Sequence, residues 1–284
     1  MADALLIATG LFVTYGKASR SAFARTARLS VPVLHGVDLE VRKGETVGIV
    51  GESGSGKTTL GRALIGLVKP ATGSIRFDGI DISTLDEREM RPLRRRMQMI
   101  FQDPMSSLNP RHTIGRILTE PMRLHGLASD HASARARAHE ILDRVGLAAS
   151  TMDCYSHELS GGQRQRVGIA RAVALRPDFV IADEIVSGLD VSTQAQVLQL
   201  LKELTREMHL ALAFISHDLS VIRSICDRVV VMQSGTIVEQ GPCERVFAAP
   251  QADYTRMLID AIPLPVLDPQ WLMRGAAVDN VGVN

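Results

Sequence analysis

A glycine-rich stretch, GESGSGKT at Gly51–Thr58, has the residue types and spacing that bind the phosphate chain of a nucleotide. It follows the short apolar run Thr46–Val50 and opens a segment with a helical pattern, which is the context that this motif requires. Its glycines allow backbone N–H groups to point at phosphate oxygens. Lys57 would supply positive charge to the β- and γ-phosphates, and the Thr58 hydroxyl would bind Mg²⁺.

Two adjacent carboxylates end a second apolar run, FVIADE at Phe179–Glu184. Asp183 is placed to hold the Mg²⁺ shell, and Glu184 is placed to act as general base on an attacking water. Two acids at the end of a strand also occur simply as solvated turn residues. A phosphate loop in the same chain favours the catalytic interpretation.

Two further polar residues follow apolar runs. His217 comes after Leu210–Ile215 in FISHD, and Gln102 ends the run in MIFQDP. A histidine at a strand end is often structural, but ligands of α/β sheets bind outside the carboxyl ends of the strands. We therefore expect His217 to lie beside Glu184, and the Gln102 amide to complete the arrangement of Mg²⁺ and water.

A second helix start suited to an anion lies in LSGGQRQRVGIARA, at Leu159–Ala172. Ser160 and Gln163 have the Ser-x-x-Gln spacing of a capping box, and the glycines at 161 and 162 leave the first backbone amides uncovered. A purely structural cap is one explanation. The other is a second phosphate-binding surface, which a chain with one phosphate loop does not need for itself.

Short apolar runs alternate with helical patterns, which predicts an α/β fold with a mainly parallel sheet. Strands are expected at Thr46–Val50, Phe179–Ala182, Leu210–Ile215 and Arg228–Met232, with a half-buried strand through Val33, Val37, Leu39 and Val41; helices are expected at Lys57–Leu67, Gly161–Leu175 and Val191–Met208. Strand signals stop between about residues 103 and 160, which indicates an inserted helical subdomain. The basic stretch Lys17–Arg28 is expected to be a solvated hairpin loop, and the Pro-rich tail from Ala261 an irregular or mobile segment.

Composition narrows the class of protein. The 284 residues are 45% apolar and carry a net charge of +1, which does not indicate a nucleic-acid surface. The three cysteines are scattered through the sequence, so we expect them to be buried free thiols. Such cysteines are typical of a protein in a reducing compartment. The N-terminus lacks the pattern of a signal peptide and no apolar run is long enough to span a bilayer, so a soluble chain with any membrane role acting through a partner is expected.

The motifs GESGSGKT, FQDPMSSLNPR, LSGGQRQRVGIARA, VIADE, SGLD and FISHD, in this order, resemble the nucleotide-binding subunit of an ATP-binding cassette (ABC) transporter. The resemblance covers roughly Leu5 to Ala249. The sequence around Gln102 and the C-terminal YTRMLIDAIP resemble the corresponding sequences of the ATPase subunits of oligopeptide, dipeptide and nickel importers. The family implies a phosphate-loop ATPase core with a mainly parallel sheet, an antiparallel β subdomain and an inserted α-helical subdomain. Residues 1–249 would form the nucleotide-binding domain and 250–284 a C-terminal extension.

The resemblance also implies roles for individual residues. Tyr15 would stack on the adenine, Ser187–Asp190 would cross a dimer interface, and the segment around Gln102 would face the permease. The family's signature segment, LSGGQ at Leu159–Gln163, would act on ATP held by a second subunit. The implied catalytic residues are Glu184, His217 and Gln102; the Mg²⁺ ligands are Thr58, Gln102 and Asp183; the ATP-binding residues are Tyr15, Gly51, Glu52, Ser53, Gly54, Ser55, Gly56, Lys57, Thr58 and Thr59 with Ser160, Gly161, Gly162 and Gln163.

The sequence departs from the family pattern at a few positions, but none of these changes removes a chemical group needed for ATP hydrolysis. Ile185 stands where many relatives have proline, Gly188 stands where alanine is common, and the tail has no cysteine for an iron–sulfur site. The implied protein is an ATPase at the cytoplasmic face of the inner membrane. It would power import of peptides or a related small solute with a permease, a second ATPase subunit and, indirectly, a solute-binding protein, without nucleic acid. The alternative is a soluble ABC-type ATPase subunit of a non-transport complex, which would act in phosphonate metabolism or on nucleic acid.

Overall fold

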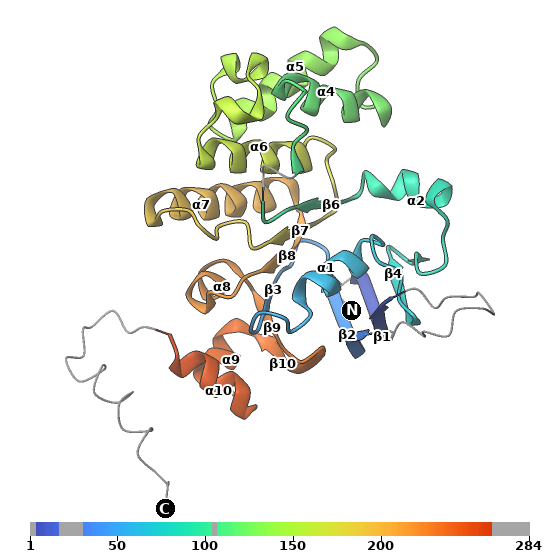
Figure 1. Ribbon diagram of the computed structural model, residues 1–284, viewed down its shortest axis with the longest axis vertical. Coiled ribbons are helices and arrows are strands. Elements are labelled where there is room, and N and C mark those ends of the chain that lie inside the picture. The colour runs from blue at the N-terminus through green and yellow to red at the C-terminus, as the bar shows by residue number, and fades with distance from the viewer. Residues whose placement is uncertain (1–3, 17–30, 104–106, 263–284) are drawn as a thin grey trace, which may run out of the picture.

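The centre of the molecule is a six-stranded sheet with the order β10-β9-β3-β8-β7-β6, in which only the edge pair β10–β9 is antiparallel (Figure 1). The computed structural model describes residues 4–16, 31–103 and 107–262. The strands are β1 Ala4–Tyr15, β2 Val31–Arg42, β3 Thr46–Val50, β4 Thr72–Phe77, β5 Ile80–Asp81, β6 Met97–Ile100, β7 Phe179–Asp183, β8 Ala211–Ile215, β9 Arg228–Gln233 and β10 Thr236–Pro242. The α-helices are α1 Lys57–Leu64, α2 Glu87–Arg94, α4 Ile114–Leu124, α5 His131–Arg144, α6 Gly161–Val173, α7 Val191–Met208, α8 Leu219–Ile225, α9 Cys243–Ala248 and α10 Asp253–Asp260, with 3₁₀ turns η1 Ala149–Asp153 and η2 Ser156–Glu158.

The short strands in the middle of this sheet are buried on both faces. Every residue of β3, β7 and β8 is buried. Alternate side chains of β7 enter two separate cores: Phe179 and Ile181 pack in one, Val180 and Ala182 in the other. This alternation is what a pleated strand between two layers produces. The expectation of doubly buried parallel strands is therefore confirmed.

A second, antiparallel sheet lies against α1 and has the strand order β2-β1-β4-β5. Leu6 of β1 and Leu34 of β2 share a core with Leu60 and Leu64 of α1. That core also includes the inward side chains of β3 such as Ile49. Helix α1, which begins at the phosphate loop, is thus held between the two sheets.

The chain between β6 and β7 is helical, and α4 and α5 lie above α6 at one end of the molecule (Figure 1). Ile114 and Leu118 of α4 pack with Leu142 of α5 and Val167 of α6 in the core that also reaches the central sheet. The observed fold therefore has the predicted class, with a mainly parallel sheet, an antiparallel sheet and a helical insertion.

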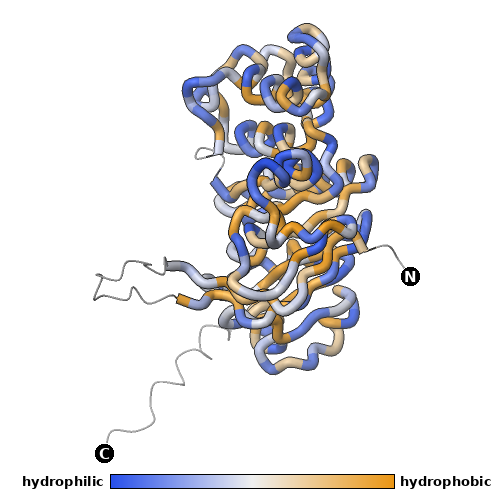
Figure 2. Tube along the Cα trace, turned by 90° about the vertical axis from the view of Figure 1, so that its right-hand side faces the viewer, coloured by the Kyte–Doolittle hydropathy of each residue, from blue (hydrophilic) through white to orange (hydrophobic). Residues whose placement is uncertain are grey.

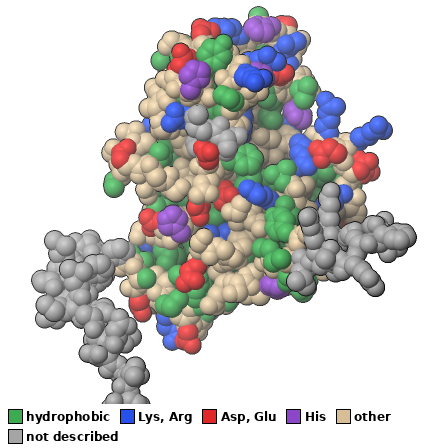
Figure 3. All heavy atoms as spheres, in the orientation of Figure 1, with side chains coloured by type: hydrophobic (Ala, Val, Ile, Leu, Met, Phe, Trp, Pro, Cys, Tyr) green, Lys and Arg blue, Asp and Glu red, His purple; other side chains and the backbone are tan. Residues whose placement is uncertain are grey.

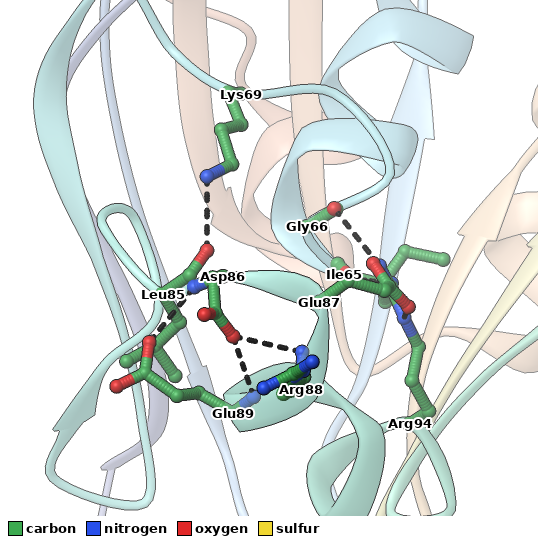
Figure 4. A network of polar contacts seen from close by, with 9 residues as sticks. All are labelled: Ile65, Gly66, Lys69, Leu85, Asp86, Glu87, Arg88, Glu89 and Arg94. Carbon is green, nitrogen blue, oxygen red and sulfur yellow. Dashed lines mark hydrogen bonds and ion pairs between the residues drawn. The ribbon is translucent and has the colours of Figure 1, made fainter.

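Helix α2 follows β5 and leads into β6, and it is bonded to the chain just after α1. Asp86 accepts hydrogen bonds from the N–H groups of Arg88 (2.8 Å) and Glu89 (2.9 Å), which begins the helix (Figure 4). The Arg94 guanidinium donates to the carbonyl of Ile65 at 2.8 Å and pairs with Glu87 at 3.0 Å (Figure 4). These contacts fix the chain just before β6, the strand that Gln102 follows.

Two predicted helices end earlier than expected. Helix α1 ends at Leu64 rather than Leu67, because Gly66 takes a left-handed backbone with φ +68°. Helix α6 ends at Val173 rather than Leu175, shortly before Arg176 at φ +50°. The hairpin predicted for residues 17–28 and the tail from residue 263 onward lie outside the described residues.

Hydrophobic residues are concentrated in the interior strands, and hydrophilic residues are frequent along the outer helices (Figure 2). Charges of both signs are interspersed over the face in Figure 3. Within residues 4–16, 31–103 and 107–262, none of the helices combines the length and apolar character needed to cross a bilayer.

Candidate active site

The phosphate loop lies between β3 and α1, and two of its glycines are required by space. A Cβ on Gly51, at φ +145°, would lie 2.1 Å from the carbonyl oxygen of Met232 in β9. A Cβ on Gly56, at φ +101°, would lie 2.9 Å from Leu34. Both positions take a backbone conformation that residues other than glycine rarely adopt, and a side chain at Gly51 would also collide with a backbone atom, so the path of the loop depends on these glycines.

Lys57 is buried at the start of α1, with 6% of its surface exposed. Its ammonium group donates to the carbonyl oxygens of Gly51 (2.7 Å) and Glu52 (2.8 Å). Burial lowers the pKa of Lys57, and the carboxylates of Glu184 and Asp183 oppose that shift. A buried cation held by neutral carbonyls is well suited to bind phosphate oxygens, so this site fits a triphosphate.

Lys57→Ala should weaken nucleotide binding, because the charge expected to bind the phosphates is lost. A hydrogen bond to a charged group contributes about 1.5–3 kcal/mol, so we expect affinity to fall by roughly tenfold to a hundredfold. Titration with a fluorescent ATP analogue measures this change. Lys69→Ala, which removes an exposed lysine bonded to the carbonyl of Leu85, is the matched control. Unchanged affinity in Lys57→Ala would contradict the assignment of the loop.

Thr58 and Asp183 meet beside the phosphate loop. The Thr58 hydroxyl donates to Asp183 Oδ1 at 3.1 Å, and Asp183 is 3% exposed. Burial raises the pKa of Asp183, the hydrogen bond from Thr58 lowers it, and the neighbouring Glu184 raises it. A hydroxyl and a carboxylate are oxygen ligands of the kind that Mg²⁺ prefers, and Mg²⁺ is commonly held by one or two carboxylates together with substrate phosphates. These two residues therefore fit a Mg²⁺ site.

Glu184 lies at the carboxyl edge of the sheet, where three strands present their ends to it. Gln102, which follows β6, donates its amide to Glu184 Oε2 at 2.8 Å. His217, which follows β8, places Nδ1 3.9 Å from Glu184 Oε1. The structure thus places His217 near Glu184, as expected, and adds a hydrogen bond to this carboxylate from Gln102, which was expected to act on Mg²⁺ and water.

The backbone of Glu184 is in an uncommon conformation. Its φ is +47°, a left-handed value that costs a residue other than glycine roughly 1–3 kcal/mol. Its N–H donates to the carbonyl of Ile215 in β8 at 3.0 Å, and its carbonyl accepts the Ser187 hydroxyl at 2.8 Å. These bonds hold the strained backbone and keep the carboxylate aimed at the strand edge.

A cavity of about 130 Å³ lies beside this carboxylate. Its lining includes Glu184, His217, Ser187 and Gly188. The volume holds several water molecules at about 30 Å³ each. Water can therefore reach the carboxylate from this side.

The signature segment forms the predicted capping box at the start of α6. The Gln163 N–H donates to Ser160 Oγ at 3.3 Å, and the Ser160 N–H donates to Gln163 Oε1 at 2.9 Å. A Cβ on Gly161 would have no atom within 4 Å, whereas a Cβ on Gly162 would lie 2.8 Å from Thr193 Cγ2, so the helix start is uncovered at Gly161. Its role toward a second nucleotide stays a prediction, as does the adenine contact of Tyr15, which ends β1 and is 42% exposed.

Two contacts that sequence reasoning missed reach the site from elsewhere in the chain. The Arg171 guanidinium of α6 lies 5.7 Å from the ring centroid of Phe101, next to Gln102. The Tyr254 hydroxyl of α10 accepts the N–H of Glu52 in the phosphate loop at 3.0 Å. No periodicity or motif marks either pair, because the partners are far apart in the sequence.

Comparisons with known proteins agree with this geometry. The family model described as ABC transporter matches residues 34–187. A peptide import ATP-binding protein of Brucella ovis is 52% identical over 241 residues, 85% of this chain and 76% of that protein. The glutathione import ATP-binding protein GsiA of Salmonella typhi is 50% identical over 247 residues, 87% of this chain and 39% of that protein. The dimeric ATP-binding cassette MJ0796, bound to ADP and Pi, has a TM-score of 0.75 and 30% identity, over 84% of this chain and 98% of that chain.

A phosphate loop beside an acidic strand end, on an α/β sheet of this topology, defines a phosphate-loop nucleoside triphosphatase. The chain belongs to the ABC transporter family, in which it is an ATP-binding, ATP-hydrolysing subunit. The relatives support the transport ATPase and not the alternative of a soluble ATPase in a non-transport complex.

Proposed function

We propose that this chain powers the import of peptides, or of a chemically related small solute, through a transmembrane permease. The observation that carries the proposal is the 52% identity to a peptide import ATP-binding protein over 85% of the chain. The similarity to a glutathione import protein extends the substrate class to small peptide-like solutes. The chain would lie on the cytoplasmic face of the inner membrane, and a solute-binding protein would deliver the solute to the permease.

We further infer that two ATPase subunits, identical or different, pair so that each signature segment faces the nucleotide of the other. The uncovered start of α6 at Gly161 supports this pairing, since its amides and helix dipole suit an anion. Ser187–Asp190 would cross the same interface. A reciprocal arrangement of this kind is what two-fold symmetry produces.

In the proposed site, ATP is held by the Tyr15 ring, by residues Gly51–Thr59 and by the partner's signature segment. Mg²⁺, when bound to Thr58, Asp183 and Gln102, would neutralise charge on the phosphates. Glu184 would accept a proton from the attacking water, and His217 would contact the γ-phosphate. Two hydrogen bonds support this orientation of Glu184: one from the Gln102 amide to its carboxylate, and one from the Ser187 hydroxyl to its backbone carbonyl.

Asp183→Asn should raise the Mg²⁺ concentration needed for half-maximal ATPase activity, since a carboxylate ligand becomes a neutral amide. We expect a shift of roughly tenfold or more, in line with the loss of an interaction with a charged group. A Mg²⁺ titration of phosphate release measures it. Asp143→Asn, on an exposed face of α5, should leave the Mg²⁺ requirement unchanged. An unshifted requirement in Asp183→Asn would remove Asp183 from the metal site.

Uptake in cells tests the transport proposal. A strain lacking this chain should lose uptake of labelled di- and oligopeptides, measured as cell-associated label. The wild-type chain should restore uptake, and Lys57→Ala should not. Uptake of peptides and of glutathione at the normal rate in the deletion strain would overturn the proposed substrate class.

A further inference from the structure

The first turn of α10 reaches the phosphate loop, which lies about two hundred residues earlier in the chain. The Tyr254 hydroxyl accepts the backbone N–H of Glu52 at 3.0 Å, and Tyr254 is 8% exposed. The hydroxyl of a buried tyrosine usually has a specific hydrogen-bond partner, and here that partner is the Glu52 N–H. The contact therefore places a group of the C-terminal segment directly on the loop.

The bond falls on a peptide unit that Lys57 also holds. The N–H of Glu52 and the carbonyl of Gly51 belong to the same planar peptide. Tyr254 binds its N–H, while the Lys57 ammonium donates to its carbonyl at 2.7 Å. Rotation of this peptide would break both bonds, so the tyrosine fixes the carbonyl that positions the lysine.

Helix α10 is itself anchored, which makes the hydroxyl a rigid contact. Glu239 of β10 accepts the N–H groups of Gln251 (2.9 Å) and Ala252 (3.0 Å), just before the helix begins. Leu258 and Ile259 of α10 pack against the core that includes β7 and β8. The helix thus joins the sheet edge, the core and the phosphate loop.

We propose that Tyr254 is a positioning residue for the phosphate loop, and that α10 thereby sets the affinity of the site for ATP. The inference rests on the proposed role of Lys57 in binding the triphosphate. The loop binds the phosphates both before and during hydrolysis, so loss of the hydroxyl should weaken binding of substrate and transition state equally. Such a loss raises KM and leaves kcat unchanged.

Tyr254→Phe in the full chain tests this, since it removes the hydroxyl and keeps the ring. A typical hydrogen bond contributes about 0.5–1.5 kcal/mol, so we expect roughly twofold to tenfold weaker binding of a fluorescent ATP analogue. KM for ATP should rise by the same factor at constant kcat. Tyr155→Phe is the matched control, since Tyr155 stacks on His157 in the helical part and should leave both values unchanged.

A double-mutant cycle separates positioning from general destabilisation. Adding Tyr254→Phe to Lys57→Ala should weaken binding no further, because the carbonyl that the tyrosine fixes then has no lysine to position. Additive losses would overturn the inference, as would a Tyr254→Phe variant with wild-type affinity beside a weakened Lys57→Ala. If Lys57→Ala also binds normally, the proposed loop assignment fails instead.

Discussion

Glu184→Gln should retain ATP binding and lose steady-state hydrolysis by roughly a hundredfold to ten-thousandfold, the range that a general base contributes. The amide has the shape of the carboxylate and can still accept the hydrogen bond that Gln102 donates at 2.8 Å. It cannot take a proton from water. Phosphate release measures turnover, and binding of a fluorescent analogue measures the intact nucleotide site.

The same variant should accumulate as a closed dimer in ATP, because hydrolysis is the step proposed to open it. Size-exclusion chromatography with and without ATP detects this species. Glu203→Gln, on the exposed side of α7 and hydrogen-bonded to Gln199, is the matched carboxylate-to-amide control and should behave as wild type. Normal steady-state hydrolysis in Glu184→Gln would remove Glu184 as the general base.

Much of this site could be predicted from the sequence because its chemistry is local. The phosphate loop needs glycines, a lysine and a threonine at fixed spacing after a buried strand, and Gly51–Thr58 has them all. The capping box at Ser160 is equally local and was confirmed, bond by bond. Parallel strands bring their carboxyl ends to one edge of a sheet, so the approach of His217 to Glu184 could also be predicted, whereas the hydrogen bond from Gln102 to Glu184 could not.

Other features could not be predicted because no local pattern encodes them. The left-handed backbone of Glu184 is unfavourable for its residue type, and bonds to Ile215 and Ser187 hold it. The hydroxyl of Tyr254 meets Glu52 only because β10 and α10 return the chain to the sheet edge. Long-range contacts of this kind depend on the whole topology, and periodicity within one segment carries no information about them.

Ser160→Arg should leave ATP binding to the single subunit intact and abolish hydrolysis. Among the described residues, the side-chain hydrogen bonds of Ser160 and Gln163 stay within the capping box, so the variant leaves the contacts of Lys57 and Thr58 in place. A long cation on the uncovered start of α6 would block the face proposed to meet the partner's nucleotide. The loss of the cap itself costs about 1 kcal/mol, a small part of the roughly 5–15 kcal/mol that stabilise a typical fold.

A second helix cap separates these effects. Asp130 begins α5 and accepts the N–H of Ser133 at 2.8 Å, in a capping box like that of Ser160. Asp130→Arg should therefore lose a similar amount of stability and keep its hydrolysis. Hydrolysis by Ser160→Arg at the rate of Asp130→Arg would mean that the signature segment is only a helix cap. Loss of hydrolysis in Ser160→Arg alone, with normal nucleotide binding, would mean that the active site takes its second half from another subunit.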